Sequence, residues 1–264
     1  MAFSILDFVL TRKVPTYSKA AMRQRERGNM KVTVWNENQH EKEDSRITDL
    51  YPGGLHEYIA GFLKSDDVEV RTATLDDPEC GLTDEVLADT DVLVWWGHMA
   101  HERVPDAVVD RVQKAVLGGM GLVVLHSGHL AKVFTRLLGT SNTLKWRDDA
   151  RERIWTVKPN HPIAKGIPET FVLDPEEMYG EPFDIADPQE VILMGWFNGG
   201  EVFRSGCTWV RGNGKIFYFQ PGHETNPSFR NEYVQQIIKN AVEWACPIRK
   251  NMELYCPHVE PLEG

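Results

Sequence analysis

Short apolar segments alternate with helical segments from Lys31 to Leu138, and this pattern constrains the fold more than any other feature of the sequence. Such alternation is typical of a parallel sheet whose two faces are covered by helices. Apolar runs predict buried strands at Lys31–Trp35, Asp91–Trp96 and Leu122–Leu125, and an alternating run predicts another at Val68–Leu75. The chain is therefore expected to form a doubly wound, mostly parallel α/β sheet.

Helices are expected in the intervals between these strands. Residues Leu50–Lys64 place apolar side chains near one helical face, and Pro105–Leu117 begins with a proline, which favours a helix N-terminus. Thr83 followed by two acidic residues predicts a short helix with its acids in the favourable first turn. Further helices are expected at Gly128–Leu138 and Asn231–Trp244.

The pattern changes after Gly139. Residues 140–215 contain irregular segments and antiparallel strands, expected at Ile154–Val157, Val191–Trp196 and Glu201–Val210. Asn213-Gly214 is a hairpin signal that joins the last of these to a strand at Lys215–Phe219. The sequence thus predicts a flavodoxin-like core with an inserted antiparallel lobe.

One domain accounts for most of the 264 residues. We expect it to span residues 30–248, followed by a polar tail at 249–264. Residues 1–29 contain six basic residues and two acidic ones, unlike the acidic remainder, and are expected to be an extension outside the core. Their apolar start lacks the basic region and cleavage site of a secretory signal.

Composition excludes several classes of protein. The hydrophobic fraction of 42% and the charged fraction of 26% are those of a globular protein, and no apolar run is long enough to span a bilayer. A net charge of −10 argues against a nucleic-acid partner. The four cysteines lack metal-binding spacing and are typical of core thiols in a reducing compartment, so a cytoplasmic location is expected.

Polar residues follow four of the predicted strands where the strands end. Ligands of open α/β sheets bind at this edge. Six of the nine histidines fall there, together with Asn36, Glu37 and Glu224. These six are His40, His98, His101, His126, His129 and His223. Because histidine is the commonest zinc ligand and the usual proton carrier near neutral pH, their convergence predicts a functional cluster. Glu176 and Glu177 could add carboxylates.

The segment GLVVLHSGH at Gly121–His129 has the strand–turn–helix shape of a nucleophile elbow. It resembles the elbow of class I glutamine amidotransferases, with His126 where their catalytic cysteine stands. The stretches VWNENQHEK, YPGGLHEYIA, DVLVWWGHMAHERV, EEMYGEPFDI, GGEVFRSGC and GKIFYFQPGHE, taken with the elbow, resemble the ThuA family of trehalose-utilisation proteins. The resemblance covers about residues 31–247.

The resemblance implies an amidotransferase-like fold without amidotransferase chemistry, because no cysteine occupies the elbow. It also implies a role in bacterial catabolism of trehalose or related disaccharides, beside an oxidoreductase that makes 3-keto sugars. The family's motif residues are present at Asn36, Glu37, His40, His98, His101, His126, His129, Glu177, Arg204, His223 and Glu224.

One hypothesis is a metal-assisted enzyme that acts on a 3-keto sugar or its glycoside by isomerisation, elimination or hydrolysis. A keto group acidifies the neighbouring C–H, so a base can start either of the first two reactions. We assign a divalent cation, zinc, to His98, His126 and His223, and the base and acid roles to Glu177 and His129.

The remaining site residues are expected to bind the sugar. Aromatic side chains of Trp96, Trp146 and Tyr179 could stack on a sugar face, and Arg147 and Arg204 could contact its hydroxyls. Further binding residues are Asn36, Glu37, His40, His101 and Glu224. The expected partner is a small sugar, without nucleic acid or membrane, and the expected assembly is a homo-oligomer.

Two alternatives remain open on the sequence. In the first, Ser127 is the nucleophile of a metal-free hydrolase, with His223 as base and Glu224 or Asp184 as the orienting acid. The first glycine of the G-x-S-x-G motif is missing, which weakens this hypothesis. In the second, the protein is a non-catalytic sugar-binding module. Metal content separates the metal-assisted enzyme from both.

Overall fold

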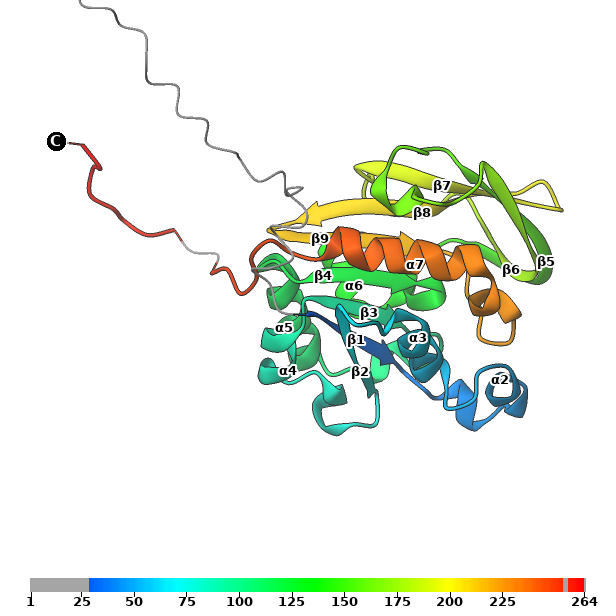
Figure 1. The fold of residues 1–264 in the computed structure, drawn as a ribbon, viewed down its shortest axis with the longest axis horizontal. Coiled ribbons are helices and arrows are strands. Elements are labelled where there is room, and N and C mark those ends of the chain that lie inside the picture. Colours follow the sequence, from blue (N-terminus) through cyan, green and yellow to red (C-terminus); the bar gives the residue numbers. More distant parts are fainter. Residues whose placement is uncertain (1–28, 254–255, 264) are drawn as a thin grey trace, which may run out of the picture.

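The structure is a computed structural model that describes residues 29–253 and 256–263. Its nine strands form one sheet in the order β2-β1-β3-β4-β9-β8-β7-β5-β6 (Figure 1). The first five strands in this order are parallel, as predicted for four of them. They are β1 (Met30–Asn36), β2 (Val68–Thr74), β3 (Val92–Trp96), β4 (Gly121–Leu125) and β9 (Gly214–Phe219).

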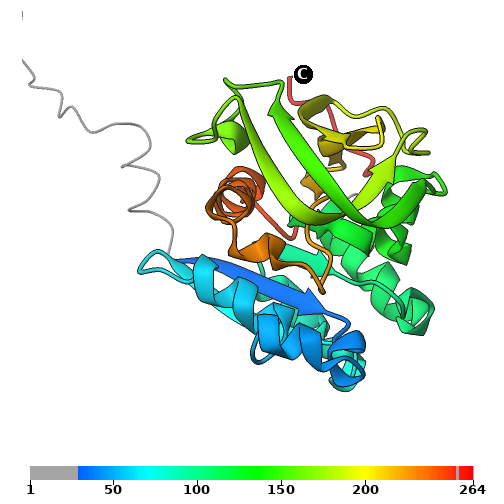
Figure 2. The ribbon, with the colours of Figure 1, turned by 90° about the vertical axis from the view of Figure 1, so that its right-hand side faces the viewer.

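The other four strands continue the same sheet with antiparallel pairing. They are β5 (Lys145–Thr156), β6 (Thr170–Gly180), β7 (Glu190–Phe197) and β8 (Val202–Arg211). The predicted hairpin joins the two halves, since β8 pairs with β9 up to Arg211 and Gly214. Figure 2 shows this part of the sheet curving over α7 (Glu232–Ala245). The fold is therefore mixed α/β, with its antiparallel strands hydrogen-bonded to the parallel core.

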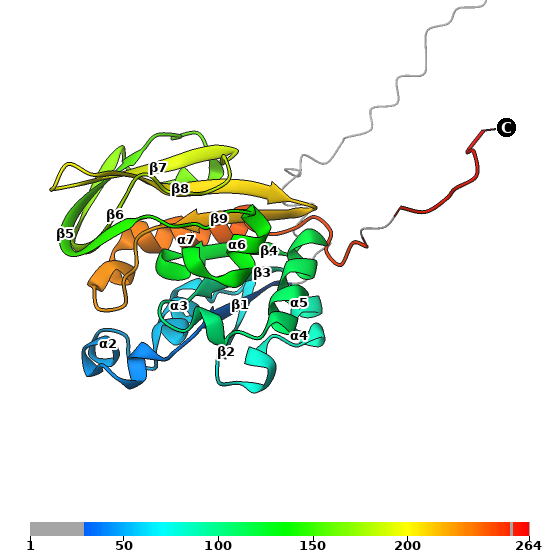
Figure 3. The same cartoon turned by 180° about the vertical axis from the view of Figure 1, so that it is seen from behind.

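Two helical layers cover the sheet. One consists of α2 (Ser45–Leu50), α3 (Leu55–Leu63) and α7, which share a core with residues such as Val34, Val94 and Phe219. The opposite layer, seen in front in Figure 3, consists of α4 (Asp84–Asp89), α5 (Asp106–Leu117) and α6 (Lys132–Leu138). Strands β3 and β4 are buried on both faces, which explains their unbroken apolar sequences.

Two predicted helices are shorter in the structure. Of the segment Leu50–Lys64, Leu50 is the last residue of α2, and α3 begins only at Leu55, after a turn in which Gly53 and Gly54 have φ of 83° and 91°. These conformations favour glycine. The segment Gly128–Leu138 is a 3-10 turn at His126–Leu130 followed by α6. The predictions were wrong here because apolar periodicity continued across a break in the helix.

Strand β6 was not predicted, although it carries both acidic residues considered for the site. Pro175 and the surrounding charged residues make its sequence atypical of a strand. It lies at the edge of the sheet, where a proline does not interrupt a ladder on both sides. Its edge position therefore explains why the sequence pattern concealed it.

The predicted extension at residues 1–29 lies almost wholly outside the described residues. The start of the predicted tail contacts the domain: Lys250 Nζ lies 2.8 Å from Asp91 Oδ1, and Met252 N donates to Gly118 O at 2.9 Å. Within the described part of the chain, no helix is long and apolar enough to cross a membrane.

Gly214 allows the β8–β9 hairpin to pack closely on α5, because a Cβ there would lie 2.1 Å from the Val116 carbonyl oxygen. We predict that Gly214→Ala lowers the free energy of unfolding by about 1–3 kcal/mol through overpacking. Gly61 lies in α3, and no atom lies within 4 Å of the position that a Cβ would occupy. Gly61→Ala should therefore raise the free energy of unfolding by about 0.5–1 kcal/mol. Urea unfolding of both variants tests the pair, and equal effects would contradict the packing assigned to Gly214.

Candidate functional site

The strand ends surround a cleft of about 440 Å³ at the carboxyl edge of the parallel strands. It brings together residues from both halves of the sheet. Its lining consists of His98, Ser127, His129, Leu130, Thr143, Leu144, Trp146, Asp148, Glu177, Tyr179 and His223. A hollow of similar volume, 460 Å³, between residues 157–162 and Glu190 contains none of the strand-end histidines. The cleft is therefore the candidate site.

His126 follows directly after β4 and is fully buried. Its φ of 49° is left-handed, a conformation that is uncommon for a residue other than glycine and that recurs at functional sites. The Tyr218 hydroxyl donates to the His126 carbonyl at 3.1 Å, and the His126 Nδ1 lies 2.7 Å from the Gln220 carbonyl. Because a carbonyl only accepts, Nδ1 carries a proton, and the Nε2 of the neutral ring has a free lone pair.

That lone pair faces a carboxylate. Glu177 Oε2 lies 2.8 Å from His126 Nε2. Burial raises the pKa of Glu177, but hydrogen bonding and charge from His126 outweigh it and leave the pKa below its usual value. Burial lowers the pKa of His126, but the same contact with Glu177 outweighs burial and leaves the pKa above its usual value. A positive charge, either a proton or a cation, is needed between these two atoms.

His223 completes this group. Its ring centroid lies 5.4 Å from that of His126, and ligand atoms of His126, Glu177 and His223 lie within 4.8 Å of one another. We call these three buried residues the His126 cluster. The Thr225 backbone N–H donates to His223 Nδ1 at 3.2 Å, and the Thr225 hydroxyl lies 2.8 Å from the same atom. Because Nδ1 accepts, Nε2 of the neutral ring carries a proton, which a cation bound there would displace. Imidazole and carboxylate ligands suit zinc.

Glu176 holds the His223 loop from behind. Neighbouring residues of a strand point to opposite faces, so Glu176 turns away from Glu177. Its carboxylate accepts from Gly222 N at 3.1 Å, from His223 N at 3.4 Å and from the Ser228 hydroxyl. Burial raises the pKa of Glu176. From the sequence, Glu176 was considered as a carboxylate of the histidine site. In the structure it instead positions the loop that carries His223.

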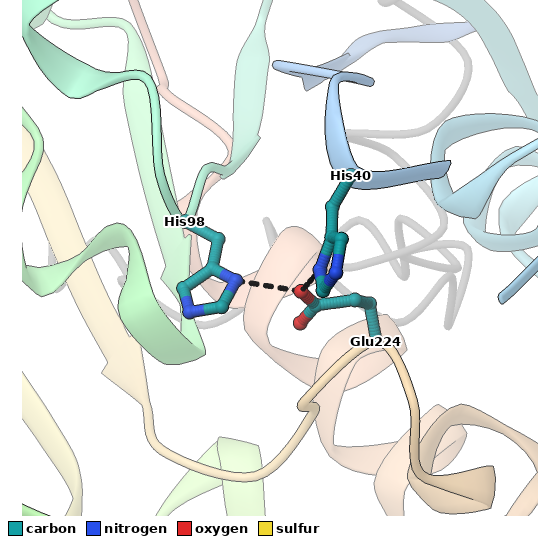
Figure 4. Close-up of side chains that lie close together, drawn as sticks. All are labelled: His40, His98 and Glu224. Carbon is teal, nitrogen blue, oxygen red and sulfur yellow. Dashed lines mark hydrogen bonds and ion pairs between the residues drawn. The ribbon is translucent and has the colours of Figure 1, made fainter. Parts of the chain in front are cut away.

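A second group lies beside the first and is shown in Figure 4. Glu224 Oε1 lies 2.5 Å from His40 Nδ1 and 2.6 Å from His98 Nδ1. We call His40, His98 and Glu224 the His98 cluster. The rings of His98 and His223 are 5.3 Å apart, so the two clusters adjoin. His98, which the sequence grouped with His126 and His223 as a metal ligand, is therefore near both of them, but its Nδ1 contacts Glu224.

His129 and Tyr179 form another wall of the cleft. His129 Nδ1 donates to the Asn142 carbonyl at 2.7 Å, so Nε2 is an acceptor. Burial lowers the pKa of His129 to about 3, which keeps the ring neutral. Burial raises the pKa of Tyr179 well above its usual value, so its hydroxyl, 3.3 Å from His126 Nε2, keeps its proton.

Several predicted binding residues lie behind the cleft and support it. The Glu37 carboxylate accepts from Met99 N at 2.8 Å and from Ala100 N at 3.0 Å, which fixes the loop after β3. The Asn36 amide donates to Glu41 Oε1 at 2.6 Å. Trp96 is fully buried and donates its indole N–H to Gly222 O at 3.1 Å, so it is not free to stack on a sugar.

Of the other residues expected to contact the sugar, some line the cleft and others do not. Trp146 lines the cleft with 63% of its surface exposed, as an aromatic platform for a sugar would. Arg147 is paired with Glu201, and Arg204 with Glu181 at 2.7 Å; neither lines the cleft. His101 lies near Gly97 in the following turn, and burial lowers its pKa. No sequence pattern indicated the lining residues Leu130, Thr143 and Asp148, which come from irregular segments and from β5.

Ser127 lines the cleft, but its geometry is not that of an activated nucleophile. It follows the left-handed residue of the turn instead of occupying that position. Its hydroxyl has no hydrogen-bond partner among the residues that the structure describes. Asp184, the proposed orienting acid, accepts from Ser141 in a different segment. The base contact that a serine hydrolase needs is therefore missing.

Glu152 is a further buried carboxyl group, held behind the site by the Ser205 hydroxyl at 3.0 Å. Burial raises its pKa well above the usual value. The folded state therefore retains a proton that the unfolded chain releases, and stability falls as the pH rises toward the folded pKa.

We predict that Glu152→Gln, which is neutral at every pH, raises the melting temperature more at pH 8 than at pH 5. Removing the penalty of about 1–3 kcal/mol for a buried, poorly paired group should add several degrees. Differential scanning fluorimetry measures the difference, and Glu190→Gln on the surface controls for the loss of one carboxyl group. An equal gain at both pH values would contradict the buried titration.

Comparisons with known proteins agree with this fold. A ThuA-like protein from Parabacteroides merdae ATCC 43184 aligns with a TM-score of 0.60 at 15% identity, covering 86% of this chain and 93% of that one. A ThuA-like protein from Bacteroides uniformis ATCC 8492 aligns with a TM-score of 0.60 at 15% identity, covering 87% of this chain and 93% of that one. A cytoplasmic protein from Salmonella typhimurium LT2 aligns with a TM-score of 0.57 at 14% identity, covering 82% of this chain and 100% of that one. At these identities the likeness establishes the fold alone.

No curated protein matches the chain. The sequence profile of the ThuA family, described as trehalose utilisation, matches residues 31–245. This range contains both histidine clusters and the whole sheet from its second residue onward. The resemblance noted in the motifs is thereby confirmed, and the chain belongs to the ThuA family.

Proposed function

We propose that this protein is a metal-assisted enzyme that acts on a 3-keto sugar or 3-keto-glycoside in the utilisation of trehalose or a related disaccharide. The family supports the sugar pathway, and the His126 cluster supports the chemistry. The substrate would enter the cleft beside Trp146, whose exposed ring suits an apolar sugar face.

One observation carries the proposal. His126 Nε2 and Glu177 Oε2 lie 2.8 Å apart in a buried site, with His223 beside them as a third candidate ligand. A bound divalent cation would take the place of the proton that otherwise joins these two atoms and, with an open position, would polarise the ketone oxygen of the substrate. Zinc fits this donor set, because it prefers imidazole and carboxylate ligands.

The residues around the cluster have distinct roles in this proposal. Glu177 has a second carboxylate oxygen, with which it removes the proton from the carbon next to the ketone. The electron pair of that C–H bond first moves toward the ketone. Its return then breaks the bond between the glycosidic oxygen and the carbon adjacent to the deprotonated one, and the glycosidic oxygen takes up a proton. His129 is neutral and presents Nε2 as an acceptor for a sugar hydroxyl, and Tyr179 presents a proton donor.

The same proposal extends to the setting of the protein. The order of the parallel strands and the turn at His126 support an origin shared with flavodoxin-like amidotransferase domains. We propose a cytoplasmic location, in line with the Salmonella protein of similar fold. Assembly into a homo-oligomer stays a prediction.

Incubation with 3-keto-trehalose and other 3-keto-glycosides, followed by NMR, tests the function. We expect the keto-glycoside to be consumed with exchange or loss of the proton next to the ketone, and the corresponding glycosides without a keto group to be unchanged. Turnover of glycosides without the keto group, or no turnover of any keto-glycoside by zinc-loaded protein, would contradict the proposal.

A further inference from the structure

Beyond the proposed function, which needs a cation only at the His126 cluster, we infer that the His98 cluster binds a second divalent cation. The site consists of His40, His98 and Glu224, whose ligand atoms lie within 4.8 Å of one another. Figure 4 shows both imidazole rings turned toward the same carboxylate. Two imidazoles and one carboxylate form a ligand set that suits zinc and neighbouring transition metals.

The charge of Glu224 supports a cation here. Its side chain is fully buried, and among the described residues no lysine or arginine pairs with it. Both imidazole contacts are made to Oε1, whereas the buried Oε2 has no hydrogen-bond partner in the described part of the chain. Most buried polar atoms in proteins have a hydrogen-bond partner. The free oxygen beside two imidazoles is what a missing positive ligand would leave.

Hydrogen bonds from residues outside the His98 cluster hold its loops in place. His40, His98 and Glu224 come from three loops that follow β1, β3 and β9. The Glu37 carboxylate fixes the loop of His98 through two backbone N–H groups, and the hydrogen bond from Asn36 to Glu41 fixes the loop of His40. This arrangement gives Asn36 and Glu37 a role: they position ligands rather than contacting the sugar.

The position of the cluster also suits an ion that exchanges with solvent. The His40 and His98 side chains are 22% and 27% exposed, and His98 lines the cleft. His223 and Glu224 are neighbours in sequence, and each belongs to a different cluster, with His223 Nδ1 3.5 Å from Glu224 Oε2. The second cation would therefore lie next to the first, where it can bind another oxygen of a sugar that carries a ketone beside a hydroxyl.

The test uses the full chain, stripped with chelator and reloaded with zinc alone. Zinc is counted by elemental analysis and located in crystals by anomalous diffraction at the zinc edge. We expect two equivalents and two peaks for wild type. His40→Ala should lose the peak at the His98 cluster and retain the other, with the second zinc bound at least about tenfold more weakly. His258→Ala, in the exposed tail, is the matched control and should keep both.

The outcomes separate this inference from the proposed function. A single peak at the His126 cluster overturns the second site and leaves the proposed function in place. A single peak at the His98 cluster overturns the cation of the proposed function and retains this site, and no peak overturns both. If His40→Ala is unstable by circular dichroism, His98→Gln gives the same test with a side chain of similar polarity.

Discussion

Replacing Glu177 by glutamine is expected to lower turnover of a 3-keto-glycoside by about 10²–10⁴-fold, the range typical of losing a catalytic base. Glutamine preserves the shape of the side chain in β6 but removes the charge that faces His126 Nε2. It is also a poorer ligand, so zinc affinity should fall by about tenfold or more. Steady-state kinetics at saturating zinc separate the two effects, because added zinc restores occupancy but not the base.

Glu190→Gln is the control for this experiment. Glu190 lies on the surface, where it pairs with Lys158 at 3.2 Å, and the substitution should leave turnover within about twofold of wild type. Full activity of Glu177→Gln at saturating zinc would show that the base lies elsewhere. The melting temperature of Glu177→Gln should change little. A large decrease would show that activity is lost because the protein unfolds.

Replacing His126 by asparagine is expected to have the larger effect on metal binding. Asparagine accepts the left-handed φ of 49° better than most residues, so the turn after β4 should persist. Its amide cannot replace the imidazole that faces Glu177, and zinc at the His126 cluster should be lost. Turnover should fall by at least about 10³-fold, since the developing negative charge on the ketone oxygen would lose its stabilisation.

Ser127→Ala and His258→Asn are the controls for His126→Asn. Ser127→Ala removes the neighbouring hydroxyl, which has no partner among the described residues, and should leave zinc content unchanged. His258→Asn removes a histidine from the exposed tail. If Ser127→Ala abolishes turnover while His126→Asn retains it, the serine hydrolase becomes the better account.

The parallel half of the fold could be predicted because its strands are buried on both faces. Unbroken apolar runs between helices, such as those of β3 and β4, are typical of the central strands of a parallel sheet. The antiparallel half was predicted only in fragments. Its β6 strand is partly exposed and contains Pro175 and neighbouring charges, and only pairing with β5 reveals it. The two glycines at 53–54 are typical of a turn, but the apolar periodicity of the surrounding residues led to the prediction of one continuous helix there.

The location of the site could also be predicted, because the ends of parallel strands must meet at one edge. The grouping of its side chains could not. His223 and Glu224 are adjacent in sequence and their side chains lie 3.5 Å apart, yet they belong to different clusters, because His223 lies beside His126 and Glu177 whereas Glu224 contacts His40 and His98. The buried position of Trp96 and the pairing of Arg204 with Glu181 likewise depend on tertiary contacts that no local pattern records.

The most direct test of the central claim measures zinc and turnover in the same samples. Wild-type protein is assayed with a 3-keto-glycoside as purified, after dialysis against chelator, and after zinc is restored. The account predicts zinc in the purified protein, loss of both zinc and turnover on dialysis, and return of both on reloading. Zinc-free protein with undiminished turnover would contradict it.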